Sequence, residues 1–174
     1  MEIVNSIPAD IDFIFRLYDE GTALQKKVAK KHWKGFERSL IEKEVAENRQ
    51  WKIVVNGQIA CVFAIAFNDP FIWGEKDKDP AIYIHRIATN PLFRGNGYVK
   101  NIISWAKQYA LKNNKFFIRM DTGSGNDRLN NYYVKCGFTC LGNTQPHDTG
   151  NLPEHYRGGG TSSLFEISLK PVNV

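Results

Sequence analysis

The chain has 174 residues, 43% of them hydrophobic and 24% charged, which is ordinary for a globular protein and excludes disordered, collagen-like and coiled-coil classes. Its net charge of +5 favours anionic partners in general, but the basic residues are mostly scattered and no nucleic-acid-reading motif is present, so we expect no nucleic-acid partner. No apolar stretch approaches the roughly 18 residues of a membrane span, and we expect no membrane partner either.

The cysteines and the N-terminal residues indicate the cellular compartment in which we expect the protein. The chain has three cysteines, which is an odd number: Cys61, Cys136 and Cys140. Each has apolar residues nearby in the sequence, and no two of them have Cys-x-x-Cys spacing. We therefore expect buried free thiols, a reducing environment and no zinc site. Residues 1–13 contain no basic segment followed by a long apolar run, so we expect no secretory signal. These features predict a soluble cytoplasmic protein.

The first part of the chain is predicted to contain one strand and two helices. Residues 2–7 read as a strand, and apolar residues at helical spacing predict helices from Pro8 to about Lys30 and from Gly35 to Asn48. Four lysines at positions 26, 27, 30 and 31 lie at the end of the first helix. They form either a solvated face or a phosphate-binding patch.

The hydrophobic period then changes to that of strands. Residues 51–55 and 58–67 are rich in β-branched and apolar side chains, and Asn56-Gly57 between them predicts a two-residue hairpin turn. Residues 68–80 are expected to form a polar loop. The later elements are, in order, strand 81–89, helix 97–114, strand 115–121, helix 127–136 ended by Gly137, and strands 138–141 and 163–169.

The resulting order, β-α-α-β-β-β-α-β-α-β-β, shows no internal repeat and no linker, so residues 1–174 are expected to form a single domain. The connection from residue 142 to residue 161 is long for a loop between two strands. It is either functional or an ordinary surface excursion.

One loop carries a chemical signal. Arg94-Gly95-Asn96-Gly97 follows the strand at 81–89 and opens the next helix. The glycines let the backbone turn tightly and approach a ligand closely. The free N–H groups at a helix start, the helix dipole and the charge of Arg94 all favour an anion. The loop therefore predicts a phosphate or pyrophosphate cradle.

Three known phosphate-binding motifs can be compared with this loop. A Walker A loop would end in Gly-Lys-Ser/Thr, which is absent, and a dinucleotide fingerprint would have a third glycine where Lys100 stands. The segment from Asn90 to Lys100 instead resembles motif A of the GNAT superfamily of acetyltransferases, whose pattern is Arg/Gln-x-x-Gly-x-Gly/Ala. Val99 departs from that pattern at its last, usually small position, and its Cβ branch is expected to crowd the pyrophosphate slightly.

A second segment, from Asn126 to Phe138, resembles motif B of the same family. The resemblance implies an α/β fold with a mixed, mostly antiparallel central sheet flanked by helices, a splayed strand pair for the cofactor, and acetyl-CoA as co-substrate without a metal. It implies that Ile87, Ala88 and Thr89 pair with the pantetheine arm and that the Ile87 N–H polarises the acetyl carbonyl. Asn126 would contact the cofactor arm, and the pyrophosphate would be held by Arg94, Gly95, Asn96, Gly97, Tyr98 and Val99.

The resemblance also implies that an amine attacks acetyl-CoA directly. Tyr133 would protonate the leaving thiolate, because a phenol with a pKa near 10 can donate to it; spacing alone also fits a core residue. His85 lies two positions before Ile87, on the same strand face, and an imidazole can accept the proton of an ammonium. A structural histidine is the other interpretation, and Asp121 is an alternative base.

Acceptor choice is expected to depend on the N-terminal helices and the late loop. Candidate wall residues, each of which also fits packing or surface roles, are Trp33, Phe36, His147, His155 and Tyr156. The sequence leaves open whether the acceptor is a small-molecule amine or a peptide or protein amine. Homodimers are common in this family. The competing hypothesis is a non-catalytic CoA-sensing module, for which Val99 is the supporting feature.

Overall fold

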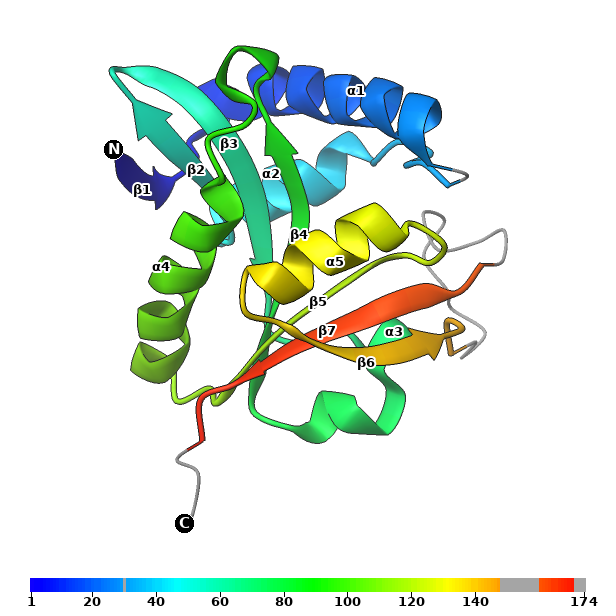
Figure 1. Cartoon of the computed structure of the whole chain (residues 1–174). Coiled ribbons are helices and arrows are strands. Elements are labelled where there is room, and N and C mark those ends of the chain that lie inside the picture. Colours follow the sequence, from blue (N-terminus) through cyan, green and yellow to red (C-terminus); the bar gives the residue numbers. More distant parts are fainter. Residues whose placement is uncertain (30, 148–159, 171–174) are drawn as a thin grey trace. The chain divides into compact units, whose positions relative to one another are not determined.

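Seven strands form the sheet of this computed structural model, which describes residues 1–29, 31–147 and 160–170 (Figure 1). They are β1 (Glu2–Asn5), β2 (Gln50–Val55), β3 (Gln58–Ala66), β4 (Ala81–Thr89), β5 (Phe117–Gly123), β6 (Thr139–Thr144) and β7 (Ser162–Ser168). Their order is β1-β2-β3-β4-β5-β7-β6. The recorded pairings are antiparallel except that of β4 with β5, which confirms the predicted mixed, mostly antiparallel sheet.

The chain divides into two compact units that do not follow the sequence order. The first comprises Met1–Ile65 and Ile84–Val99, and the second comprises Ala66–Tyr83 and the chain from Lys100 onward. Strand β4 contributes to both. Its first three residues, Ala81–Tyr83, pair with β5 inside the second unit, and the ladder ends there.

In the first unit, helices α1 (Ile11–Val28) and α2 (Arg38–Ala46) lie behind β3 and β4 as drawn in Figure 1. Their apolar faces pack on Val62 of β3 and Ala88 of β4, as helical periodicity predicts. The buried helix residues of this core are Ile11, Ile14, Leu17, Tyr18, Ile41 and Val45. The β2–β3 turn is confirmed, since Asn56 and Gly57 have φ of 49° and 77°.

Two helix boundaries differ from the sequence-based expectation for local reasons. A short 3-10 turn, Pro8–Asp10, precedes α1, and the Asp10 carboxylate accepts a hydrogen bond of 2.8 Å from the Ile7 N–H. Helix α2 begins at Arg38 rather than at Gly35, because Gly35 has a φ of 103°, which is not helical.

In the second unit, β7 lies between β5 and β6, and α5 (Asp127–Lys135) packs its Tyr133 ring on Phe165 of β7. Helix α4 (Tyr98–Lys112) starts at the end of the first unit and continues into the second. A second apolar cluster joins Ile72, Trp73, Ala81, Tyr83 and Leu164. Strands β5 and β7 therefore contribute buried residues to the core of this unit.

Residues 68–80 are not the polar loop that was predicted. They contain a short helix, α3 (Pro70–Trp73), and a 3-10 turn, η2 (Gly74–Lys78). Ile72 and Trp73 are buried at 1% and 3% exposure. The prolines and charges of this segment indicated a loop, but a tertiary apolar contact decides its structure.

The cysteines also differ from expectation. All three are free thiols, but only Cys61 is buried, while Cys136 is half-buried and Cys140 is exposed. Cys140 is exposed because β6 is the last strand of the sheet order and all but one of its residues are exposed. Among the described residues, no helix is long and apolar enough to cross a membrane.

Candidate cofactor and catalytic site

The predicted phosphate cradle is an open turn in the first unit. After β4, Asn90 caps the 3-10 turn η3 (Pro91–Phe93) by accepting a 3.1 Å hydrogen bond from the Leu92 N–H. Gly95 and Gly97 follow with φ of 86° and 67°, and no heavy atom lies within 4 Å of a Cβ built on either glycine. The backbone of this loop therefore faces open space in which a phosphate group fits.

Helix α4 begins at the end of this loop, so the N–H groups of its first turn lack partners one turn earlier in the helix. Arg94 is 40% exposed and its guanidinium lies 3.9 Å from the carboxylate of Glu20, a contact that an incoming phosphate can replace. Tyr98 and Val99 are buried at 7% and 8% exposure. Both side chains are therefore largely covered by the protein.

A pocket of about 800 Å³ lies beside this turn, within the first unit, between α1 and the segment Asn90–Leu92. Two of the three acidic residues that line it have cationic partners. Asp10 binds Lys52 at 2.6 Å, and Glu20 faces Arg94. Because three acidic residues line this pocket and the Arg94–Gly97 segment contains none, the glycine turn is the better anion site.

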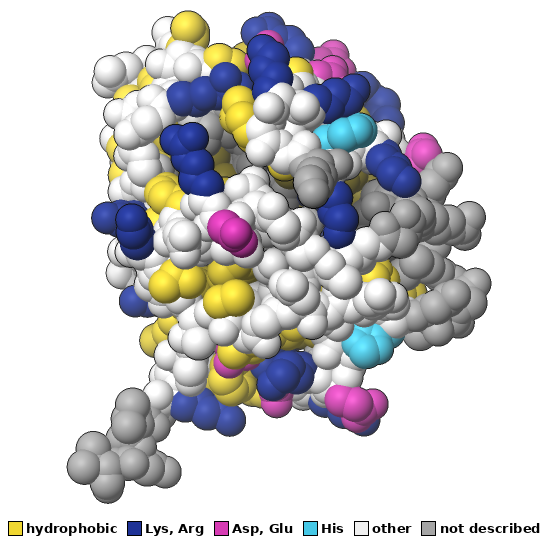
Figure 2. All heavy atoms as spheres, turned by 45° about the vertical axis from the view of Figure 1, so that its right-hand side comes forward, with side chains coloured by type: hydrophobic (Ala, Val, Ile, Leu, Met, Phe, Trp, Pro, Cys, Tyr) yellow, Lys and Arg dark blue, Asp and Glu magenta, His cyan; other side chains and the backbone are white. Residues whose placement is uncertain are grey.

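Lys and Arg side chains lie in several separate groups on the face drawn in Figure 2, with neutral surface between them. Lys26, Lys27 and Lys31 are exposed, while Lys30 lies outside the described residues. On this face the cations therefore form separate groups and no single continuous stripe.

Strand β4 presents the candidate catalytic residues around an unusual backbone position. His85 and Ile87 flank Arg86, which has a φ of 51°, in the left-handed region that non-glycine residues rarely adopt. His85 and Ile87 are half-buried, whereas Ala88 is buried in the core with α1 and α2. The Thr89 hydroxyl donates to the Cys61 sulfur at 3.6 Å, and burial raises the pKa of that thiol to about 11.

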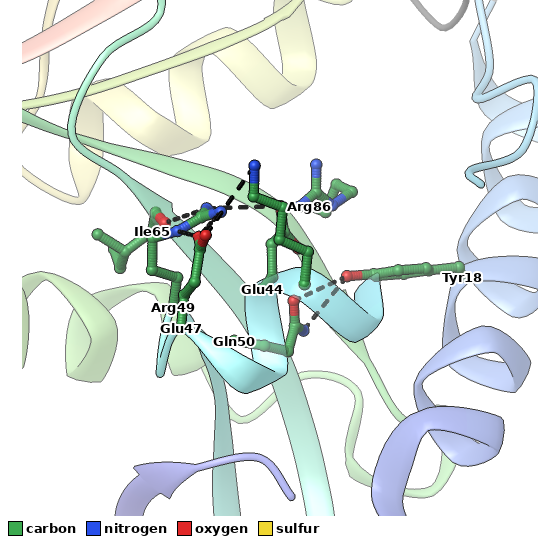
Figure 3. Close-up of polar contacts among 8 residues, drawn as sticks. Tyr18, Glu44, Glu47, Arg49, Gln50, Ile65 and Arg86 are labelled. Carbon is green, nitrogen blue, oxygen red and sulfur yellow. Dashed lines mark hydrogen bonds and ion pairs between the residues drawn. The ribbon is translucent and has the colours of Figure 1, made fainter. Parts of the chain in front are cut away.

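The side chain of Arg86 enters a buried polar network that sequence patterns did not indicate (Figure 3). Its guanidinium pairs with Glu44 of α2, and the two side chains are 9% and 5% exposed. Nearby, the Tyr18 hydroxyl and the Gln50 amide lie 3.3 Å apart. Burial raises the pKa of Tyr18, and Arg86 acts in the opposite direction. One signal was available: Glu44 stands at a core position of α2, beside Ile41 and Val45.

Motif B forms α5 in the second unit. Asn126 is the N-cap, with its side-chain oxygen accepting a 3.1 Å hydrogen bond from the Leu129 N–H. Tyr133 follows seven positions later on the same face, roughly 10 Å along the helix axis. It is 8% exposed, and its ring centroid lies 5.4 Å from Phe165 and 6.3 Å from Phe138. The Tyr133 ring is thus a core residue as well as the candidate acid.

Asp121, the alternative base, has an acidic neighbour that the sequence did not reveal. Asp121 on β5 and Asp69 before α3 bring carboxylate oxygens within 4.8 Å of each other. Burial raises the pKa of Asp121 to about 6. Burial, and then the charges of Asp121 and Asp77, raise the pKa of Asp69 to about 8. Two carboxyl groups this close, one buried and one half-buried, do not both ionise readily.

The candidate acceptor-wall residues fall into separate places. Trp33 and Phe36 are half-buried in the first unit, with their ring centroids 5.6 Å apart, and both pack against Tyr18. The His147 N–H donates to the Phe71 carbonyl at 2.6 Å in the second unit. His155 and Tyr156 lie outside the described residues, as does most of the loop from 142 to 161.

The mixed sheet, with a glycine turn between the end of β4 and the start of α4, defines an α/β protein with a candidate anion site at a helix N-terminus. Residues 19–138 match the acetyltransferase (GNAT) family, so the chain belongs to that family. The matched range contains both the cradle and the whole of motif B.

Curated relatives match only part of this chain. The uncharacterized N-acetyltransferase YesJ of Bacillus subtilis (strain 168) is 30% identical over 74 residues, 42% of this chain and 41% of that protein. Streptothricin acetyltransferase of Escherichia coli is 37% identical over 59 residues, 34% of each chain. The aligned segments therefore span less than half of each of these relatives.

Solved structures match nearly the whole chain. A GNAT-family acetyltransferase from Listeria monocytogenes has a TM-score of 0.75 at 23% identity, covering 97% of this chain and 94% of that one. The putative acetyltransferase yncA from Salmonella typhimurium, solved with acetyl-CoA, has a TM-score of 0.69 at 13% identity, with 98% and 94% covered. At these identities the likeness establishes the fold.

Proposed function

We propose that this chain transfers an acetyl group from acetyl-CoA to a primary amine by direct attack of the amine, and that residues 1–174 act as a single acetyltransferase domain. The observation that carries the proposal is the open turn at Gly95 and Gly97, placed between β4 and the N-terminus of α4. Family membership supports the reaction type. The turn supports phosphate binding by this particular chain.

Each candidate residue has a binding role in this proposal. Bound acetyl-CoA supplies an activated thioester. The Arg94–Val99 segment holds its pyrophosphate through backbone N–H groups and the Arg94 charge. Ile87 donates its N–H to the acetyl carbonyl oxygen, where negative charge develops. Ala88 and Thr89 pair with the pantetheine arm, and the Asn126 amide contacts the same arm.

Two proton transfers complete the proposed chemistry. His85 takes the proton of the incoming ammonium, directly or through water. Asp121 is the alternative base, because a carboxyl group with a pKa of about 6 is mostly ionised at neutral pH and can still accept a proton. Tyr133 protonates the leaving thiolate. No step of this scheme requires a metal ion.

The proposed acceptor class is an amine of a small molecule or of a peptide or protein. Support comes from the names of similar proteins, a streptothricin acetyltransferase and a spermidine N-acetyltransferase, the latter 14% identical with a TM-score of 0.65. A homodimer is also proposed, from the family resemblance, and so is a reducing cytoplasmic location, from the three free cysteines.

Calorimetric titration tests the cofactor assignment. We expect acetyl-CoA and CoA to bind with micromolar or tighter affinity, and ATP and NAD to bind much more weakly. An amine panel then follows, with products detected by mass spectrometry, because the exposed Cys140 thiol would itself consume a thiol reagent. No binding of CoA would overturn the proposal.

Replacing Tyr133 with Phe tests its role as the acid. We expect turnover to fall about 100-fold, as for loss of a general acid, while the dissociation constant of acetyl-CoA changes less than about threefold. Tyr132→Phe is the matched control, since Tyr132 is the neighbouring residue and is 37% exposed. Tight CoA binding with no turnover in the unmodified protein would favour the CoA-sensing alternative.

A further inference from the structure

Arg86 sets the direction of the peptide group that carries the Ile87 N–H. That peptide unit follows Arg86 directly, so the φ and ψ angles of Arg86 orient it relative to the preceding part of β4 and to His85. The φ of 51° at Arg86 lies far from the extended values of a strand. The candidate carbonyl-polarising donor therefore depends on a single left-handed residue.

The Arg86 side chain ties this residue to a neighbouring helix. Its guanidinium pairs with the Glu44 carboxylate of α2 (Figure 3). The guanidinium also lies 5.2 Å from the centre of the Phe36 ring. Glu44 also lies 3.8 Å from Arg49, whose guanidinium donates to the Ile65 carbonyl of β3 at 3.3 Å. The Glu44 carboxylate thus connects the left-handed residue of β4, Arg86, both to α2 and, through Arg49, to the end of β3.

Two features of Arg86 are unfavourable for stability: its left-handed backbone and its buried ion pair. Glycine would adopt the left-handed conformation without the steric cost that arginine has there. A buried ion pair is also a poor source of stability compared with apolar packing. Glu44 Oε2 and Arg86 Nε, moreover, are buried without a hydrogen-bond partner in the described part of the chain. Strain that the surroundings hold in place is typical of functional sites.

We propose that the Arg86–Glu44 ion pair is a positioning device that holds the left-handed turn of β4 and thereby aims the Ile87 N–H at the acetyl carbonyl, an inference that rests on the proposed function. Neither side chain touches the reacting atoms. The pair acts through the backbone: Glu44 fixes the guanidinium, the guanidinium fixes the Arg86 dihedral angles, and these fix the Ile87 peptide group.

Two substitutions remove the Arg86–Glu44 ion pair in different ways. Glu44→Gln keeps the side-chain shape and removes the charge. Arg86→Gly removes the side chain and leaves the left-handed conformation accessible. We expect both to lower kcat about 10- to 100-fold, as for a misdirected catalytic group, with the acetyl-CoA dissociation constant changed less than about threefold. Glu42→Gln is the control on α2, where Glu42 pairs with Arg38 at the surface, and it should leave kcat unchanged.

Hydrogen exchange supplies a measurement that does not require turnover. We expect faster amide exchange confined to the peptide spanning residues 85–88 in Glu44→Gln and Arg86→Gly, and wild-type exchange in Glu42→Gln. Unchanged exchange there, or a kcat per folded molecule equal to that of the control, overturns the proposal. The proposal is also overturned if amide exchange rises throughout the protein and kcat falls only in proportion to the folded fraction, because the ion pair would then have a structural role alone. If the wild-type protein transfers no acetyl group, the proposed function fails, and the exchange result still decides whether the pair holds the turn.

Discussion

At the scale of single residues, Gly97 combines a backbone requirement with an open surface. Its φ of 67° suits glycine, and a Cβ built there would meet no atom within 4 Å. We expect Gly97→Ala to cost about 1 kcal/mol of stability, because only the left-handed backbone is strained. Acetyl-CoA should bind about 10-fold more weakly, since the new methyl group occupies the space where a phosphate approaches the loop.

Gly57→Ala is the matched control for this effect. Gly57 in the β2–β3 turn has a φ of 77° and is equally open. We expect a similar loss of stability in chemical denaturation and unchanged acetyl-CoA binding by calorimetry. Equal affinity of Gly97→Ala and wild type would show that the turn does not hold the pyrophosphate.

The residues that sequence reasoning identified are those whose chemistry is local. The glycine turn, Arg94 and the start of α4 lie within a few positions of each other, so their pattern is visible in the chain. The partner of Arg86 is not local, because Glu44 stands 42 residues away in the sequence. The positive φ of Arg86 was also unpredictable, since no glycine marks it.

At the scale of elements, Arg119 of β5 attaches the segment from α3 to η2 to the sheet of its own unit. Its side chain is 1% exposed and binds Asp79 at 2.5 Å and Glu166 of β7 at 2.8 Å. It also donates to the Lys76 carbonyl at 2.5 Å and lies 4.8 Å from the centre of the Trp73 ring. One buried cation therefore organises a segment whose own sequence indicates a loop.

We expect Arg119→Ala to destabilise the protein by about 3–5 kcal/mol, because it leaves Glu166 with an uncompensated charge and opens a cavity beside Trp73. Residues 66–80 should become the first site of limited proteolysis. Arg128→Ala, at an exposed position on α5, is the control and should behave as wild type. Cleavage of Arg119→Ala at wild-type sites and rates would contradict this role.

The elements that periodicity predicted are those whose apolar pattern decides their structure. Strand β4 was predicted at its observed bounds, and the order of the longer helices and strands is confirmed. The 68–80 segment differs because its order depends on Arg119 and Trp73, contacts with residues far along the chain. Helix ends differ by a few residues where a backbone angle intervenes, as at Gly35.

At the scale of the whole molecule, the two compact units could not be predicted from the sequence. The first unit is made of two segments separated by Ala66–Tyr83, and its boundaries fall at the end of β3, inside β4 and at the start of α4. No change of composition marks such a boundary, because a strand has the same apolar pattern on both sides of it. The family match, by contrast, runs through both units without interruption.

The stability of the whole molecule should depend on pH through Asp69. Its pKa is about 8 in the folded protein, raised by burial and by Asp121 and Asp77, against about 3.9 in an unfolded chain. Between these values the folded state holds a proton that the unfolded state has lost. Stability therefore falls as the pH rises from about 4 to about 8, by on the order of 1 kcal/mol per pH unit. Asp121, with a pKa of about 6, adds to the fall between about pH 4 and pH 6.

Asp69→Asn isolates this contribution, because asparagine resembles the protonated acid and cannot ionise. We expect the variant and wild type to unfold at similar urea concentrations near pH 4 and the variant to be the more stable near pH 8, so that its stability declines less steeply with pH. Asp19→Asn, at an exposed position on α1, should follow the wild-type curve. If the two stability curves of wild type and Asp69→Asn run parallel from pH 5 to pH 8, Asp69 is ionised throughout that range. Asp121 would then have an anionic neighbour, which would disfavour its own ionised form as the alternative base.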